Sequence, residues 1–309
     1  MWPFDQGVVL TLYLATLALH AVFIGYVVIG SAYALVRQHD PVTAVVRDRL
    51  PFMLGCGITA GVAPLLFIQL LHQRRFYTAN LLLGPRWFAV VPALILGFYA
   101  LYLAKSSERF RRAALTVALL CFVFVAWSWS ELHELMQSDP AWAAFYAAGH
   151  RVFTAATIAP RFVIAIGGMA TLFAVIAAWA ADGAGRSRVA RVAAAGRVLS
   201  VLGALWLWRS GFSVTGPALA WFGILVGASV VDTAAWLVAT RSPTDRVLAV
   251  ATAGGAAALL AAAVVREAPR IGLIESHPQA AGSGGSVVFL VACVVGGVAI
   301  AWVVRQVRT

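Results

Sequence analysis

One histidine lies inside a long apolar run near the N-terminus. His20 is flanked by Leu17, Ala18, Ala21 and Val22. A neutral imidazole on a helix that faces the interior of a bundle is a suitable axial ligand for haem iron. The alternative is a neutral histidine that forms a hydrogen bond to a neighbouring helix. The sequence leaves both interpretations of His20 open.

Three further histidines, His72, His133 and His150, lie at or just beyond the ends of apolar runs. Each alone is typical of an interfacial histidine, but all three are expected at a similar depth on the outer side of the membrane. This shared position predicts a haem edge or a quinol site. His133 belongs to the sequence Glu131-Leu-His-Glu134, in which a carboxylate beside an imidazole can accept quinol protons and release them outside. The spacing does not predict zinc, because no second histidine follows on the same helix face.

Other polar residues in or beside apolar runs allow a structural interpretation as well as a functional one. We interpret Asp232 as a structural hydrogen-bonding group or an interfacial side chain, with a proton relay as the alternative. Arg161 either caps the interface or pairs with an anion such as a haem propionate. The cysteines form no CxxC pair, so we predict small core residues rather than disulfides or metal ligands. They are Cys56, Cys121 and Cys293.

The composition requires a membrane to position these residues. Of the 309 residues, 62% are hydrophobic and 11% are charged, whereas globular domains carry about 25% charged residues. So few charges cannot cover a water-facing surface, which excludes soluble enzymes, nucleic-acid binders and disulfide-rich secreted domains. The net charge of +11 fits basic residues that flank membrane spans and face anionic lipid.

Apolar runs of about 20 residues each match the thickness of a bilayer core. Because lipid cannot satisfy backbone groups, these runs predict helices, and the fold class is an all-α, polytopic transmembrane helix bundle. We predict nine spans, or eight if the Ala-rich run 246–265 does not cross. Their ranges are 8–35, 51–72, 87–104, 113–131, 160–181, 192–209, 217–239, 246–265 and 286–304.

The distribution of Lys and Arg predicts the orientation. Fifteen lie in the odd-numbered loops and the C-terminal tail, Arg197 among them, and six in the even-numbered loops, Arg266 and Arg270 among them. Cytoplasmic loops carry the excess of basic residues. The N-terminus is therefore predicted outside and the C-terminus in the cytoplasm.

Two local patterns predict further features. Asp139-Pro140 followed by aromatic residues at helical spacing predicts a short amphipathic helix on the outer membrane surface, at about 140–158. GxxxG spacings at Gly57–Gly61 and Gly223–Gly227 predict close helix contacts.

The first part of the chain, about residues 8–180, resembles subunit I of cytochrome bd quinol oxidase. The run from Ala15 to Gly25 resembles the first helix of that family, in which a histidine at the position of His20 binds a b-type haem. The run from Gly55 to Gln69 resembles the second helix, and Met136-Gln-Ser-Asp-Pro140 resembles the Met-Gln-Asn-Pro that follows the fourth. The resemblance implies a subunit in the cytoplasmic membrane of a bacterium.

The sequence also departs from that family. The run Val90–Ala100 has none of the acidic residues of the third helix, and Pro160–Ile164 has no second haem-ligating histidine. Met169 is the last methionine of the chain, so a later Met ligand is missing too. We therefore expect a bd-like unit over 1–181 without a three-haem oxygen-reducing centre. Additional small-residue-rich helices follow over 182–309.

Two functions are compatible with these features. The first is a respiratory electron-transfer subunit that holds one b-type haem through His20, binds quinol near the outer surface and passes electrons to a partner such as cytochrome c. In that case the haem edge would include Arg161, His150 and His72. The second is a non-redox anchor subunit, or a small-molecule transporter, in which haem sites have degenerated. Either protein contacts lipid, is expected to join other membrane subunits, and binds no nucleic acid.

Overall fold

The computed structural model describes residues 3–149, 152–274 and 294, with side chains from Gly7 onward. The chain is helical, and no strand occurs among these residues, which confirms the predicted all-α fold. The helices are α1 (Pro3–Val36), α2 (Pro41–Leu71), α3 (Gln73–Leu83), α4 (Pro85–Phe88), α5 (Val90–Ser106), α6 (Arg111–Leu135), the 3-10 turn η1 (Asp139–Ala141), α7 (Trp142–Ala147), α8 (Ile158–Trp179), α9 (Gly183–Arg209), α10 (Ala218–Ala239) and α11 (Asp245–Ile271).

Eight segments of the described chain are long and apolar enough to cross a membrane. They correspond to the first eight predicted spans, with α4 and α5 together forming the third. The Ala-rich run 246–265 is therefore part of a membrane-length helix, α11. The predicted ninth span, 286–304, lies outside the described residues except for Val294.

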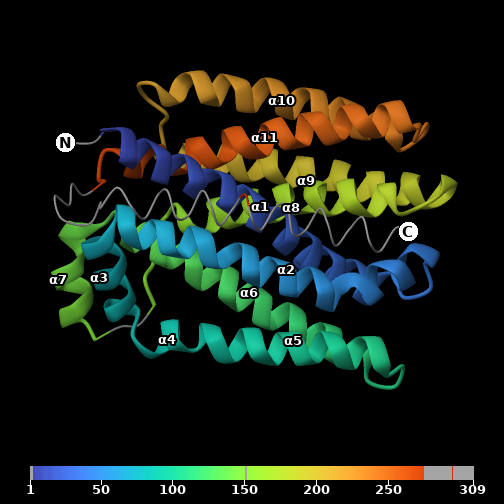
Figure 1. Ribbon diagram of the computed structural model, residues 1–309, viewed down its shortest axis with the longest axis horizontal. Helices are drawn as coiled ribbons and strands as arrows, with labels where there is room; N and C mark the ends of the chain where they lie inside the picture. Colours follow the sequence, from blue (N-terminus) through green and yellow to red (C-terminus); the bar gives the residue numbers. More distant parts are fainter. Residues whose placement is uncertain (1–2, 150–151, 275–293, 295–309) are drawn as a thin grey trace. The chain divides into compact units, whose positions relative to one another are not determined.

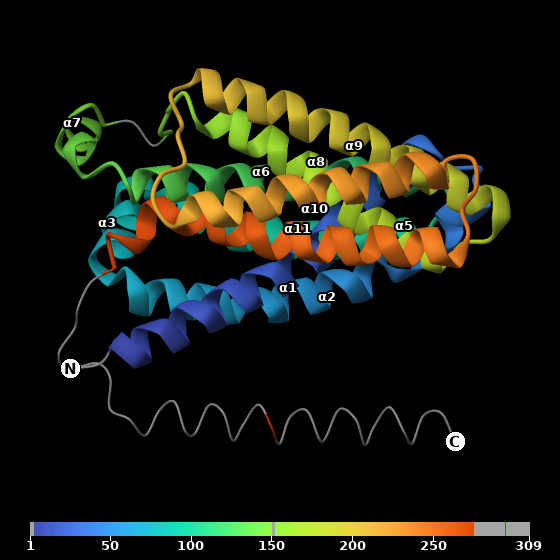
Figure 2. The ribbon, with the colours of Figure 1, turned by 90° about the horizontal axis from the view of Figure 1, so that it is seen from above.

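Residues 9–274 form one compact unit. In this unit the long helices lie side by side and their connections alternate between two ends (Figures 1 and 2). We call the end that carries α3, α4, α7 and the α9–α10 connection the outer end, after the predicted orientation. The histidines at 72 and 133 both lie there.

Small residues set the closest helix contacts. Gly167 of α8 lies against the backbone of Gly196 on α9, and Gly203 of α9 lies against the backbone of Ile164, so a side chain at any of these glycines would collide with the facing helix. Of the two predicted GxxxG pairs, Gly57 and Gly61 contact side chains of α1. A Cβ at Gly223 or Gly227 would have no atom of a facing described residue within 4 Å.

The predicted surface helix at 140–158 is shorter in the structure. Its helical part covers η1 and α7 and ends at Ala147. Gly149 then adopts a φ of +66°, a left-handed conformation that favours glycine and interrupts the helix. Residues 152–155 are irregular.

Many of the arginines that the sequence assigned to loops lie within helices, Arg197, Arg266 and Arg270 among them. Arg197 is near the middle of α9, and Arg266 and Arg270 lie in the last turns of α11. Arg197 and Arg270 are drawn inside because each meets a buried carboxylate on the protein. Arg197 and Arg270 therefore do not belong to the loop charges that predict the orientation.

At the opposite end, Asp40 joins three helices. Its Oδ1 accepts a hydrogen bond from the N–H of Val42 at 3.0 Å and so caps α2, while the hydroxyl of Tyr33 on α1 donates to Oδ2 at 2.9 Å. Arg188 of α9 lies 2.7 Å from the same oxygen. Burial acts to raise the pKa of Asp40, but the two hydrogen bonds and the charge of Arg188 outweigh it and hold the pKa below its usual value.

We expect Asp40 to stabilise the fold above its ordinary pKa of about 3.9, because its pKa is lowered only in the folded state. This stability is lost as the pH falls through the folded-state pKa. Asp40→Asn keeps a capping oxygen but removes the charge, so it should cost about 1 kcal/mol or less at pH 7. Thermal melting in detergent between pH 7 and pH 3 measures the difference.

The difference between wild type and Asp40→Asn should shrink as the solution becomes acidic. Asp40→Ala is the companion variant, because it also removes the cap and should cost about 1 kcal/mol more at every pH. A gap between wild type and Asp40→Asn that does not change with pH would contradict the assignment.

Candidate functional site

The last turns of α6 carry three buried ionisable side chains at the outer end. Glu131 is 0% exposed, His133 is 4% exposed and Glu134 is 8% exposed. Residues two apart on a helix point about 200° away from one another, so Glu131 and His133 lie on opposite faces of α6. The sequence predicted all three as one site, but the structure divides them between two neighbourhoods.

Arg161 of α8 connects His133 with Glu134. Its Nε lies 2.8 Å from Glu134 Oε1, and its Nη1 donates to His133 Nε2 at 3.4 Å. The hydroxyl of Thr157 donates to Glu134 Oε2 at 2.7 Å. Arg161 thus already has an internal carboxylate partner rather than being held ready for an external anion.

The contact with Arg161 also determines the tautomer of His133. A guanidinium can only donate, so His133 Nε2 must accept. The hydrogen of a neutral imidazole is then on Nδ1, which is buried and has no hydrogen-bond partner among the described residues. His133 therefore presents an unused N–H donor inside the protein.

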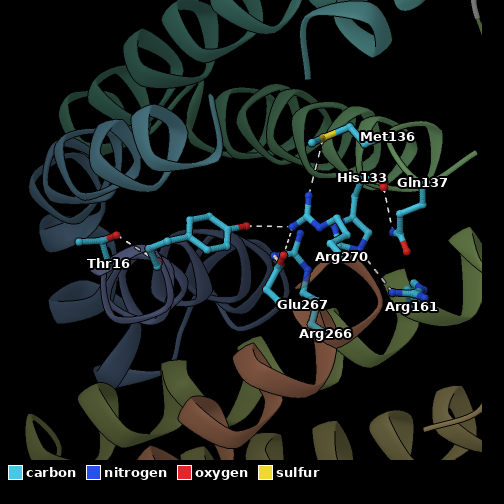
Figure 3. A network of polar contacts seen from close by, with 9 residues as sticks. Thr16, His133, Met136, Gln137, Arg161, Arg266, Glu267 and Arg270 are labelled. Atoms are coloured by element: carbon cyan, nitrogen blue, oxygen red, sulfur yellow. Dashed lines mark hydrogen bonds and ion pairs between the residues drawn. The ribbon is translucent and has the colours of Figure 1, made fainter. Parts of the chain in front are cut away.

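A second group, which the sequence did not predict, lies beside His133 (Figure 3). Glu267 and Arg270 of α11 are each 2% exposed and form an ion pair one turn apart. Arg270 also donates to the hydroxyl of Tyr13 on α1 at 2.9 Å, and it contacts the sulfur of Met136 at 3.7 Å. Arg266, which is partly exposed, lies 3.0 Å from Glu267.

The signal for this group was present in the sequence. Glu267 and Arg270 are three residues apart, the spacing at which opposite charges meet on a helix. Reading residues 266–270 as a loop concealed it, because the period of a helix was not applied there. The group brings α1, α6 and α11 together at the outer end.

On the other face of α6, Glu131 pairs with Arg86 of α4. Arg86 Nη2 lies 3.0 Å from Glu131 Oε1, and the indole N–H of Trp127 donates to the same oxygen. Arg86 lies just before the predicted third span, 87–104, and the sequence pattern indicated no role for it. Its partner could not be read from the sequence, because the α3–α4 segment that positions it was expected as a loop.

His20 of α1 is half-buried and contacts α2. Its Nδ1 is 2.8 Å from the backbone oxygen of Gly57. Because a carbonyl oxygen only accepts, Nδ1 must carry the hydrogen, and Nε2 of the neutral ring keeps its lone pair. Gly61 makes room for the ring, since a Cβ there would lie 2.8 Å from both Nδ1 and Cε1.

The remaining predicted residues have different positions. His72 follows α2 as its C-cap at the outer end and is 3% exposed. His150 lies outside the described residues. Within the described part of the chain, no group of three or more His, Cys, Asp or Glu side chains could hold a metal ion.

Asp232 of α10 is paired inside the bundle. It is 0% exposed, and Arg197 of α9 forms an ion pair with it. On its other side Gly254 of α11 comes so close that a Cβ there would lie 3.1 Å from the backbone of Asp232. The predicted structural role of Asp232 is consistent with this contact, whereas a side chain that reaches out to the interface is not.

Comparison with models of known protein families gives no match, and comparison with curated proteins gives none either. The chemistry of the site therefore follows from its own residues. Those residues offer one imidazole with a free Nε2 lone pair, at His20, and a buried set of carboxylates, arginines and a histidine at the outer end.

We expect Asp232→Leu to destabilise the protein by about 3–5 kcal/mol, because it leaves the charge of Arg197 buried and unpaired. The double variant Arg197→Met with Asp232→Leu should recover most of that loss, since it removes both charges. Thermal melting of the three proteins in one detergent measures the effect. If the double variant is as unstable as Asp232→Leu, the cost does not come from an unpaired charge.

Proposed function

We propose that this protein is an integral membrane subunit of a respiratory electron-transfer complex that holds one b-type haem through His20. The observation that carries the proposal is the hydrogen bond between His20 Nδ1 and the backbone oxygen of Gly57. Ligating histidines usually donate their second ring N–H to a carbonyl or a carboxylate, which orients the ring and raises the basicity of the other nitrogen. His20 has this arrangement on a membrane-spanning helix.

The residues around His20 fit such a ligand. The ring is held between two helices by an acceptor on α2, and Gly61 leaves the space it occupies. When bound, a haem would supply one-electron transfer within the membrane. The protein would contribute the orientation of the imidazole and the apolar surroundings of α1 and α2.

The outer end supports the handling of protons that accompanies quinol oxidation. Glu134 and His133 both contact Arg161, so a carboxylate and an imidazole, two groups that can take up protons, lie around one guanidinium. Glu267 lies between the buried Arg270 and the partly exposed Arg266, close to the outer surface. This arrangement favours a bd-like subunit that takes electrons from quinol and passes them to a partner such as cytochrome c.

A visible spectrum of the purified protein, together with a pyridine haemochrome assay, tests the proposal. We expect about one b-type haem per chain, and its loss in His20→Ala. A protein without haem, or one whose haem is unaffected by His20→Ala, would overturn the proposal. The non-redox anchor would then become the better interpretation.

Gly61 provides a sharper test than removal of the ligand. In Gly61→Ala the new methyl group would push the imidazole away from Gly57, because the space is already filled by the ring. We expect haem affinity to fall about 10–100-fold, as it does for metals when an orienting partner is lost. Haem content after titration of the apoprotein is the measurement.

Gly55→Ala is the matched control. Gly55 lies on the same helix, and a Cβ there would have nothing within 4 Å. Gly55→Ala should therefore bind haem as the wild type does. Equal losses in Gly55→Ala and Gly61→Ala would indicate a general effect on α2 rather than displacement of His20.

A further inference from the structure

The ion pair between Glu131 and Arg86 is incompletely satisfied. Both donors that reach Glu131 from side chains, Arg86 Nη2 and the indole N–H of Trp127, meet the same oxygen, Oε1. Glu131 Oε2 and Arg86 Nε are buried and have no hydrogen-bond partner among the described residues, and the backbone N–H of Phe153 approaches the same carboxyl group as a donor. One unused acceptor and one unused donor thus belong to a single ion pair.

Aromatic rings surround this pair. The guanidinium of Arg86 lies 5.8 Å from the centre of the Phe124 ring. The ring of Trp87, the residue after Arg86 on α4, meets that of Trp129 edge to face with their centres 5.0 Å apart. Trp127 contacts Phe162 of α8 in the same manner, at 5.4 Å. Flat apolar walls with a few convergent polar groups are typical of sites for ring-shaped ligands.

Arg86 is the member of the pair nearest the bilayer, since 19% of its side chain is exposed whereas Glu131 is buried. No residue of α4 is buried, and α4 and α5 lie at the edge of the unit formed by residues 9–274 (Figure 1). The neighbourhood of His133 differs, because α1, α8 and α11 enclose it and Arg270 fills its interior. A ligand that diffuses in the membrane reaches Arg86 without crossing the bundle.

We propose that Arg86 and Glu131 bind the headgroup of a quinol that enters from the bilayer beside α4. A quinol hydroxyl donates to Glu131 Oε2 and accepts from Arg86 Nε, which uses both unsatisfied atoms. The tryptophans contact the ring, and the isoprenoid tail remains in lipid. This inference rests on the proposed function, since it names the place where its quinol binds.

The chemistry predicts a preference that a purely structural ion pair would not have. A carboxylate accepts hydrogen bonds only, so Glu131 distinguishes a quinol, which has O–H donors, from a quinone, which has none. In Glu131→Gln the amide can donate to a quinone carbonyl. The wild type should therefore bind quinol more tightly than quinone, and Glu131→Gln should reduce or reverse that order.

The experiment uses the full-length protein in nanodiscs of quinone-free lipid, under anaerobic conditions. Decyl-benzoquinone binding is read from quenching of tryptophan fluorescence, and binding of the corresponding quinol from its competition with the quinone. Arg86→Lys keeps the positive charge but removes the Nε donor, so the quinol Kd should rise about tenfold or more, the usual effect of losing a hydrogen bond to a charged group. Arg75→Lys is the matched control, since Arg75 pairs with Asp139 at the same end and its change should leave the Kd as it is.

Equal losses in Arg75→Lys and Arg86→Lys would overturn the site, as would unchanged binding in both Arg86→Lys and Glu131→Gln. Loss of binding in His133→Gln alone would place the headgroup in the interior instead. Absence of quinol binding to the wild type overturns the inference even if haem is present. A protein that binds quinol at Arg86 but contains no haem contradicts the haem-bearing function and leaves the quinol site standing.

Discussion

A charged side chain within a bilayer has only the protein to pair with, because the hydrocarbon offers neither water nor counter-ions. In residues 9–274 this constraint determines which helices stay together. Arg197 joins α9 to α10, Arg270 joins α11 to α1 through Tyr13, and Arg161 joins α8 to α6. Each of these arginines lies against a buried carboxylate. The packing of small residues brings the helices close, and the ion pairs determine which faces meet.

These contacts differ in how firmly they determine the structure. The contact of α8 with α9 depends on glycines that leave backbone against backbone, so any side chain at Gly167 or Gly196 would separate the helices. At the outer end, the hydrogen bond from Arg270 to Tyr13 joins two helices that are distant in sequence, α11 and α1. The first and last described spans are thus connected by a polar contact, whereas α8 and α9 are connected mainly by small residues.

Much of this architecture follows from elementary sequence patterns. The positions of the first eight spans follow from the length of the apolar runs, because the bilayer imposes that length on any spanning helix. The residue types of the candidate site were also predictable, because ionisable groups are rare in such a chain. Their partners were not. Glu131 and Glu134 occur one turn apart, but only the arrangement of α4 and α8 decides that they meet Arg86 and Arg161, respectively. Glu267 and Arg270 were missed because helix α11 extends further than its apolar run.

Two arginines from other helices contact the end of α6. Arg86 pairs with Glu131, and Arg161 contacts His133 and Glu134. A rotation of α6 about its long axis would break both contacts at once, so these two contacts fix the rotation of the helix. A molecule that displaced Arg86 would free Glu131, which lies one helical turn from Glu134, the partner of Arg161. One helix end therefore carries both the contact at the lipid-facing edge and the contact in the enclosed polar interior.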